Sequence, residues 1–144
     1  MTAPAYDDGN IFARILRGEI PSHRVYEDEA TVAFMDVMPQ GPGHLLVVPK
    51  AASRNLLDAD PAVLAGLLPV VQKLARAAKA AFAADGVTVL QFNEGAAGQT
   101  VFHLHIHVIP RHEGVPLVAH SGAMEKPEVL AENAAKVRAA LAAL

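Results

Sequence analysis

The stretch His103-Leu104-His105-Ile106-His107-Val108-Ile109 alternates histidine with an aliphatic residue. Side chains of an extended strand point to opposite faces in turn, whereas a helix would spread the three imidazoles around its axis. β-branched residues also favour a strand, and proline interrupts one inside a sheet. We therefore predict a half-buried strand over residues 101–109 that ends before Pro110, with its histidines on one face and its aliphatic residues in the core.

The rest of the chain predicts short strands and amphipathic helices around this strand. The expected strands cover residues 23–26, 31–35, 45–48 and 87–92, with a hairpin turn at Glu27-Asp28-Glu29. The expected helices cover residues 11–16 after an N-cap at Asn10, residues 61–84 after Asp60, and the C-terminal end from Pro127. Asp85-Gly86 is expected to end the long helix, and Pro69 to kink or split it. These elements predict an α+β fold with a mainly antiparallel five-stranded sheet, in one domain of residues 1–144.

Composition limits the partners and the compartment. A chain of 144 residues with a formal charge of −3 can bury one core and has no broad basic field for nucleic acid. It has no cysteine, which suits a reducing compartment and removes thiolate zinc sites and thiol catalysis. The first residues lack an apolar leader segment, and no apolar run approaches the roughly 18 residues that would span a membrane. We therefore expect a cytoplasmic protein with a small-molecule partner and no membrane or nucleic-acid contact.

The histidine row indicates chemistry at phosphorus. Imidazole has an ordinary pKa of about 6.5, so at neutral pH much of it is uncharged and able to attack an electrophile. His105 is the central ring and the best placed nucleophile, and its attack on phosphorus would give a phosphohistidine that water then cleaves. The phosphoryl oxygens would be held by His107 and by the loop of residues 93–100, which offers two amides, a hydroxyl and backbone N–H groups near Gly95 and Gly98.

Two other interpretations of the histidines remain open at this point. Each ring by itself could be an ordinary hydrogen-bonded residue of the core or surface. Alternatively, His-x-His on a strand is a common zinc pair. The ends of the row lie about 13 Å apart at the backbone, so one ion could take two of the rings but not comfortably three. We therefore expect no metal and no cofactor.

The motif also resembles a known family. His103 to Ile109 matches the signature of the histidine triad (HIT) nucleotide hydrolases and transferases. The similarity covers residues 10–111 and is carried by residues 11–21, 32–36, 39–50, 93–95 and 98–101. These segments are similar to the branch of histidine triad nucleotide-binding proteins, so residues 125–144 would form a helical extension to the part that carries the motifs.

The resemblance implies a HIT-like fold, a homodimer that joins two five-stranded sheets, and a nucleoside monophosphoryl group bound beside the histidine strand. It implies that His105 is the nucleophile, that His107 binds phosphate, and that His103 and His44 support them. Further roles follow by position: phosphate and leaving-group contacts for Asn93, Gln99 and Thr100, ribose binding for Asp36, and an apolar base pocket of Ile11, Phe12, Ile15, Phe34 and Val37. From the pattern alone, Ile15 and Phe34 are explained at least as well as plain core.

The implied reaction is hydrolysis of a purine nucleoside 5′-phosphoramidate or a related nucleotidyl bond through a covalent nucleotidyl-histidine. A nucleotide-binding adaptor with little activity, a dinucleoside polyphosphate hydrolase and a metal-dependent hydrolase remain as alternatives.

The chain departs from the family pattern in two places. Some bacterial members bind structural zinc through Cys-x-x-Cys where this chain has Asn10 and Ala13, so no such zinc is expected. The segment after Arg111 does not match the short tail of the phosphoramidases, which puts the leaving group in question. Arg111, His112 and His120 are expected to lie in a solvated loop.

Overall fold

The computed structural model describes residues 4–119 and 123–144. Its elements follow in the order α1 (Ile11–Leu16), β1 (Arg24–Glu27), β2 (Thr31–Met35), β3 (Leu45–Pro49), α2 (Pro61–Ala81), β4 (Gly86–Leu90), the 3₁₀ helix η1 (Gly95–Ala97), β5 (Ile106–Arg111) and α3 (Pro127–Ala142). The strands form one sheet in the order β1-β2-β3-β5-β4, and every pair is antiparallel. The predicted α+β class with a five-stranded antiparallel sheet is therefore confirmed.

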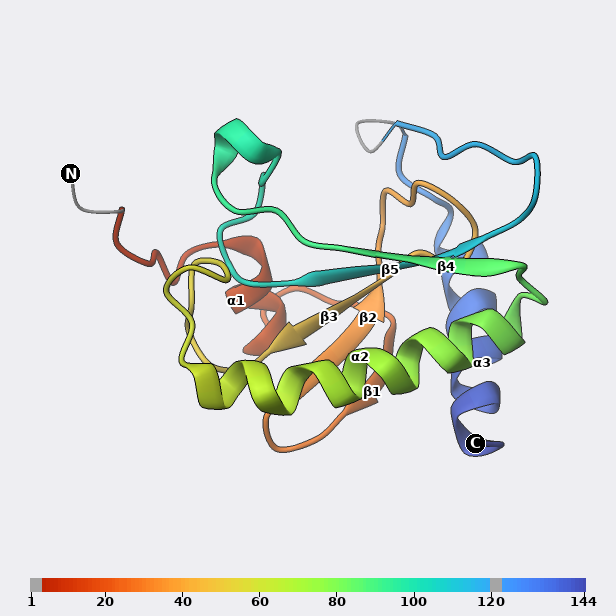
Figure 1. Cartoon of the computed structure of the whole chain (residues 1–144), viewed down its shortest axis with the longest axis horizontal. Helices are drawn as coiled ribbons and strands as arrows, with labels where there is room; N and C mark the ends of the chain where they lie inside the picture. Colours follow the sequence, from red (N-terminus) through yellow and green to blue (C-terminus); the bar gives the residue numbers. More distant parts are fainter. Residues whose placement is uncertain (1–3, 120–122) are drawn as a thin grey trace.

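The sheet is buried on both faces because its strands alternate between two apolar clusters. On one face, Ala33 and Met35 of β2 pack with α2 and α3, as do Leu45 and Val47 of β3. On the other face, the intervening side chains of β2 and β3 pack with Phe12 and Ile15 of α1. Figure 1 shows α2 running across the sheet, with the C-terminal end of α2 lying against α3. The period of two in the sequence thus separates a helical face from a face that α1 and the loops cover.

The histidine strand keeps the predicted alternation but not the predicted extent. Leu104 and Val108 lie in the cluster under α2, and Ile106 packs against it, so the aliphatic residues face the helices as expected. However, β5 begins only at Ile106. Before it, Leu104 donates its backbone N–H to the Ser53 carbonyl, and the His105 side chain bonds to the backbone of the same segment. These contacts, one with the distant Ser53 and one within the segment, take the place of ladder hydrogen bonds, so the predicted start at residue 101 is wrong.

Pro110 lies inside β5 rather than after it. It is aligned with Val87 of the edge strand β4, and the strand continues to Arg111. On the other side, the register with β3 ends at Val108. Since Pro110 lies beyond that paired part, the missing N–H is tolerated there, and the prediction that it ends the strand is wrong.

Helix α2 also ends differently from the prediction. Asp60 caps its first turn by accepting the Ala62 N–H, as expected. The helix stops at Ala81, and Ala83 takes the left-handed conformation with φ of 47°, whereas Gly86 already belongs to β4. The helix runs through Pro69 without a break, so the expected split does not occur. Pro69 lies on the exposed side, where water can reach the carbonyl that lacks its usual donor.

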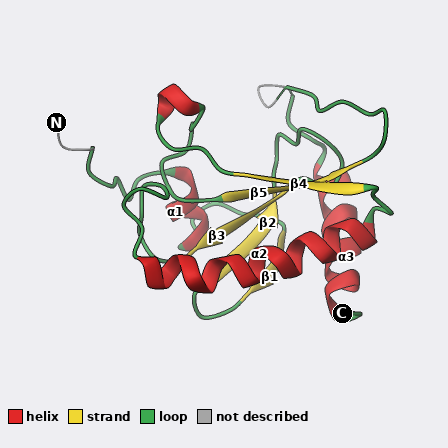
Figure 2. Cartoon of the chain, in the orientation of Figure 1, coloured by secondary structure: helices red, strands yellow, loops and turns green. Residues whose placement is uncertain are grey.

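The remaining elements match closely, with small shifts of their ends. Asn10 caps α1 by accepting the Ala13 N–H, and α3 begins at Pro127, both as predicted. The first hairpin turns one residue later than expected, because the Asp28 carboxylate accepts the N–H groups of Ala30 and Thr31. The long connection between β4 and β5 carries η1 and stands at one end of the sheet (Figure 2). Within the described residues, the helices are all too short or too polar to cross a membrane.

Gly43 provides a test of the packing between the loop before β3 and the end of α2. Its φ is +86°, and a Cβ added there would lie 2.5 Å from the Phe82 ring. We expect Gly43→Ala to lower the free energy of unfolding by about 3 kcal/mol, because both the backbone conformation and the packing become strained. Urea unfolding measures this effect. Gly66→Ala is the matched control: it lies in α2 with no atom near the added Cβ, and it should stabilise by about 0.5–1 kcal/mol. Equal effects of the two substitutions would contradict the prediction.

Candidate active site

A cavity of about 480 Å³ lies on the α1 face of the sheet. Its wall combines α1, the loop after β2, the loop before β5 with its His105, and His107 of β5. The predicted residues that line it are Ile11, Phe12, Ile15, Phe34, Asp36, Val37, Gln99, Thr100, His105 and His107. Phe12 meets Phe34 edge to face with ring centroids 5.5 Å apart, which leaves an apolar wall suited to a flat ring system. The cavity is therefore mostly apolar, with a polar edge at the histidines.

Backbone contacts determine where His44 and His107 carry their protons. The Gln40 backbone N–H donates to Nδ1 of His44, so this fully buried ring must carry its proton on Nε2. Nε2 of His44 lies 2.9 Å from Nδ1 of His107 and 3.4 Å from Oδ2 of Asp36. Since Nε2 of His44 donates, Nδ1 of His107 accepts, and the proton of His107 is on Nε2. His107 is thus set as a hydrogen-bond donor at the cavity wall.

His103 and His105 are fixed in the same way by backbone carbonyls. The Pro49 carbonyl lies 2.8 Å from Nε2 of His103, so that nitrogen carries the proton and Nδ1 accepts a hydrogen bond from the Tyr6 hydroxyl at 2.6 Å. The His103 carbonyl lies 2.7 Å from Nδ1 of His105, which must therefore donate. Nε2 of His105 is left unprotonated in the neutral ring, as nucleophilic attack requires. The Phe12 ring meets the His105 ring edge to face at 4.7 Å and restricts its orientation.

The four rings therefore form two pairs, each with one ring in the core and one at the cavity: His44 with His107, and His103 with His105. The ring centroids of His105 and His107 are 5.0 Å apart, so both could reach one phosphoryl group. His44 and His103 do not line the cavity, and each holds a neighbour from behind. Burial lowers the pKa of His103 below its ordinary value, although the Pro49 hydrogen bond opposes the shift. His103 is thus neutral near pH 7.

One group of side chains in the described part of the chain could in principle hold a metal ion. Ligand atoms of Asp36, His44 and His107 lie within 4.8 Å of one another, and all three residues are buried. However, a cation would require the lone pair of Nε2 of His44, and the Gln40 contact places the proton on that nitrogen. Binding a metal there would cost a hydrogen bond to the backbone, so the chemistry of this group favours sharing protons over coordination.

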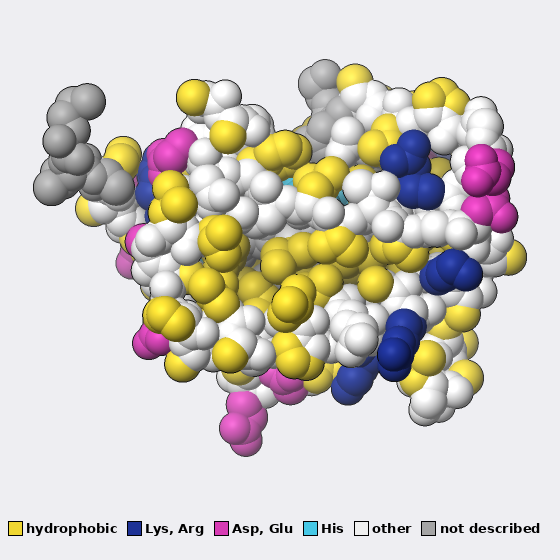
Figure 3. Space-filling view, in the orientation of Figure 1, with side chains coloured by type: hydrophobic (Ala, Val, Ile, Leu, Met, Phe, Trp, Pro, Cys, Tyr) yellow, Lys and Arg dark blue, Asp and Glu magenta, His cyan; other side chains and the backbone are white. Residues whose placement is uncertain are grey.

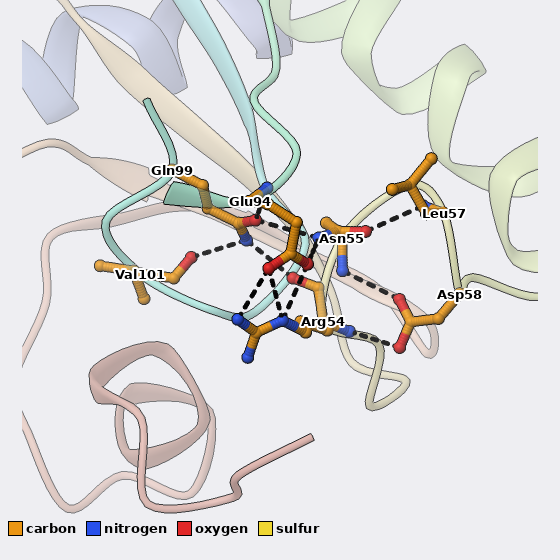
Figure 4. Close-up of polar contacts among 7 residues, drawn as sticks. All are labelled: Arg54, Asn55, Leu57, Asp58, Glu94, Gln99 and Val101. Carbon is orange, nitrogen blue, oxygen red and sulfur yellow. Dashed lines mark hydrogen bonds and ion pairs between the residues drawn. The ribbon is translucent and has the colours of Figure 1, made fainter. Parts of the chain in front are cut away.

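A polar network holds the loop before β5 in place (Figure 4). The Arg54 guanidinium makes hydrogen bonds of 2.9–3.2 Å to both carboxylate oxygens of Glu94 and also lies over the Phe102 ring. These bonds hold the pKa of Glu94 below its ordinary value. The Asn55 amide bridges Glu94 and Gln99. Glu94 has a φ of 72°, an unusual value for a residue with a Cβ, so the network maintains a strained start of the loop.

Both amides that the sequence assigns to phosphate are already hydrogen-bonded, Gln99 within this network and Asn93 beside it. The Gln99 carboxamide accepts from Asn55 and from the Glu94 N–H, and it donates to the carbonyls of Arg54 and Val101. The Asn93 carboxamide is bonded to Gln91 and to the Leu56 N–H and does not line the cavity. Thr100 lines the cavity and is exposed. Of the three predicted polar side chains of this loop, Thr100 is thus the one positioned to meet a ligand directly.

Arg111 and His112 lie away from the cavity wall. Arg111 is the last residue of β5 and pairs with Gly86 of β4, so the expectation that it lies in a solvated loop is wrong. Arg111 donates to the Thr88 hydroxyl, and the His112 ring is bonded to the Phe82 carbonyl. Neither lines the cavity. His120 lies outside the described residues.

The structure adds residues to the site that the sequence did not indicate. Tyr6 and Gln40 contact the supporting histidines, and Arg54 holds the loop. Phe92 and Met124 line the cavity, and the Phe92 ring lies 5.8 Å from that of His107. Most of these contacts join segments far apart in the chain, so no local pattern could reveal them.

Comparisons with known proteins identify the family of the chain. The HIT domain family matches residues 17–114. An uncharacterised HIT-like protein of Mycobacterium tuberculosis is 43% identical over 115 residues, which cover 79% of each chain. The adenylylsulfatase HINT3 of Arabidopsis thaliana is 38% identical over 103 residues, which cover 72% of this chain and 52% of the relative. A crystal structure of a Hit-like protein involved in cell-cycle regulation from Bartonella henselae, with an unknown ligand, superposes with a TM-score of 0.89 at 59% identity and covers 94% of this chain and 99% of the other.

The chain belongs to the HIT family. The resemblance of the histidine motif is thereby confirmed, together with the fold that it implied. Family membership and the adenylylsulfatase relative support a hydrolase that acts on a nucleotide.

His103 predicts part of the acid sensitivity of this fold. Its pKa is lowered by burial, so below about pH 6.5 the unfolded chain binds a proton that the folded protein does not. The free energy of unfolding should therefore decrease as the pH falls below about 6.5, until the pH passes the folded pKa. Urea unfolding between about pH 7 and 5 should show a shallower loss for His103→Gln, whose amide can still donate to the Pro49 carbonyl. Identical slopes for the variant and the wild type would contradict this prediction.

Proposed function

We propose that this protein hydrolyses purine nucleoside 5′-phosphoramidates or related nucleotidyl bonds through a covalent nucleotidyl-His105. The observation that carries the proposal is the proton arrangement of the two cavity histidines. The His103 carbonyl leaves Nε2 of His105 as the attacking nitrogen, and the contact with His44 leaves Nε2 of His107 as a donor. A nucleophile and a phosphate donor thus lie side by side before substrate arrives.

The reaction would proceed in two displacements. Nε2 of His105 attacks phosphorus, the bond from phosphorus to the leaving nitrogen breaks, and the amine departs with that electron pair and a proton from solvent. Water then attacks phosphorus, the bond from phosphorus to Nε2 breaks with its electron pair returning to Nε2, and the water gives up a proton to solvent. The products are free His105 and a nucleoside monophosphate. During both steps the Nε2–H of His107 and the Thr100 hydroxyl would donate to the phosphoryl oxygens, while His103 and His44 hold the two reacting rings.

The rest of the cavity would bind the nucleoside. The purine would lie against Ile11, Phe12, Ile15, Phe34 and Val37, since these apolar residues line one wall. Asp36 is buried at the cavity edge, and its Oδ1 accepts the Met38 N–H, which orients the carboxylate for ribose hydroxyls. Asn93 and Gln99 would not contact the phosphate or the leaving group through their amides, because these amides are already hydrogen-bonded. They would instead hold the loop that carries Thr100 in position beside the phosphate. No metal and no cofactor is required.

The nucleophile can be tested by substitution. His105→Asn should reduce kcat for an adenosine 5′-phosphoramidate by at least about 10³-fold, because the attacking nitrogen is lost. Binding of adenosine monophosphate should change little, since the base and ribose contacts remain. Amine release and isothermal titration measure the two quantities. His112→Asn is the matched control, because its ring lies outside the cavity, and it should keep wild-type kcat. Full activity of the His105 variant would rule the mechanism out.

The alternative functions give different results in the same assay. A nucleotide-binding adaptor would bind adenosine monophosphate without turnover by the wild type. A metal-dependent hydrolase would lose turnover in chelator, whereas the His105 mechanism predicts no change. A substrate panel of adenosine and guanosine phosphoramidates, adenylyl sulfate and a dinucleoside polyphosphate would separate the leaving groups. Adenylyl sulfate is included because of the Arabidopsis relative.

We also propose that the chain forms one folded unit over residues 1–144, acts in the cytoplasm and works as a homodimer. The cysteine-free composition supports the compartment. For the dimer, β4 is an edge strand, and edge strands offer unpaired backbone groups to a second copy. Apolar side chains form a band between α2 and β4 (Figure 3), and the exposed apolar residues Leu68 of α2 and Val89 of β4 belong to these elements.

The dimer proposal predicts a size in solution. Sedimentation at micromolar concentration should give twice the chain mass of 15.2 kDa. Val89→Lys should shift the protein towards monomer, because a charge would be buried in the interface. Val115→Lys changes a similarly exposed valine in the loop after β5 and should leave the dimer intact. A monomeric wild type would refute the proposal.

A further inference from the structure

Tyr6 connects the segment before α1 to the histidine motif across 97 positions of sequence. Its hydroxyl lies 2.6 Å from Nδ1 of His103, and the two rings meet edge to face with centroids 5.6 Å apart. His103 is 1% exposed, so this hydrogen bond lies at the buried end of the site. Tyr6 does not line the cavity, and it therefore acts on the chemistry only through other groups.

Asn10 determines the direction of this hydrogen bond. Its Oδ1 accepts the Ala13 N–H as the N-cap of α1, so the Nδ2 amide faces Tyr6, at 3.0 Å from the hydroxyl oxygen. An amide NH₂ can only donate, and the Tyr6 oxygen therefore accepts from Asn10 and gives its own proton to His103. The Pro49 carbonyl imposes the same order from the other side, because it requires the His103 proton on Nε2. The Asn10 amide and the Pro49 carbonyl therefore both require the Tyr6 hydroxyl to donate to Nδ1 of His103.

The series of hydrogen bonds from Asn10 through Tyr6 reaches the nucleophile through the backbone of His103. With both ring nitrogens held, His103 is anchored between Tyr6 and Pro49. The carbonyl of the same residue accepts Nδ1–H of His105 at 2.7 Å. Asn10 also caps α1, whose Phe12 packs on the His105 ring. The N-terminal segment thus contacts the support of His105 from two directions, one polar and one apolar.

We infer that Tyr6 is a positioning residue for His105. It acts by pairing with Nδ1 of the neutral His103 ring, whose proton the Pro49 carbonyl holds on Nε2. The inference rests on the proposed function, since it assigns a role in turnover. Without Tyr6, Nδ1 of this buried imidazole would have no donor, so the residue would move towards another partner. The His103 carbonyl would then no longer hold His105 in line with phosphorus.

Tyr6→Phe tests this role with the least change in shape. We expect kcat to fall roughly tenfold while KM for the nucleotide substrate stays within about twofold, because the base and ribose contacts are untouched. The matched control is Tyr26→Phe, which removes the chain's other tyrosine hydroxyl. That hydroxyl also donates at 2.6 Å, but to Asp28 at the first hairpin, and its loss should leave kcat unchanged. Wild-type kcat in Tyr6→Phe, or an equal decrease in the control, would overturn the inference.

Asn10→Asp reverses the proton order without removing a side chain. An Asp N-cap still accepts the Ala13 N–H, so the stability of α1 should be maintained. Its second oxygen can only accept, however. It would draw the Tyr6 proton away from His103, and it would lose the hydrogen bond that the Asn10 amide donates to the Asp7 carbonyl at 2.7 Å. We expect a decrease in kcat like that of Tyr6→Phe, together with a small decrease in the urea midpoint from the lost contact with the Asp7 carbonyl. A purely structural role of Tyr6 predicts wild-type kcat here, and that result would count against the inference.

The ¹⁵N signals of the His103 ring test the inference without turnover. The wild type should show the Nε2–H tautomer with a hydrogen-bonded Nδ1, and Tyr6→Phe should shift the Nδ1 signal, whereas Tyr26→Phe should not. If the wild type hydrolyses none of the substrates, the proposed function fails, but the ring signals still test the hydrogen bond between Tyr6 and His103. An unchanged Nδ1 signal in Tyr6→Phe would refute the inference.

Discussion

The site depends on hydrogen bonds between imidazole rings and the polypeptide backbone. A carbonyl can only accept and an N–H can only donate, so Pro49, His103 and Gln40 impose one tautomer on each ring that they contact. His44 passes this choice on to His107. The tautomer of all four histidines is thereby fixed before any ligand is present. Little reorganisation is needed when a ligand binds, because the backbone segments that fix the tautomers are themselves packed.

These contacts also explain how the protein can bury so many polar rings. His44 and His103 are almost completely removed from solvent, and an unpaired polar group in that position would cost about 1–3 kcal/mol. Each of these two rings has a partner at both nitrogens. The same bonds that make burial tolerable therefore determine the chemistry, so stability and function are linked at these residues.

The two faces of the sheet have different roles: one supports the histidine strand, and the other forms the cavity. The α2 and α3 face is a dense apolar core, and it holds the strand of His107 rigid from behind. The α1 face leaves a cavity because its covering elements are short and irregular, and the longest of its loops is fastened by the Arg54–Glu94 pair rather than by a ladder. A strained Glu94 and a Gln99 with every amide contact used show that this loop is held in one shape. Rigid supports on both sides of a small cavity suit a reaction that needs alignment at phosphorus.

The cavity-lining residues of α1 and β2 followed from the resemblance to the HIT family. The sequence by itself determined the class of fold and the alternation of the histidine motif. These features depend on neighbours in the chain, such as the period of two in the strands and the caps at Asn10 and Asp60. Only the tertiary structure decided where β5 begins, why Pro110 lies inside it, and which nitrogen of each histidine carries a proton. Those outcomes rest on partners distant in sequence, such as Pro49 for His103 and Glu94 for Arg54, and no local pattern specifies which backbone group a buried ring will meet.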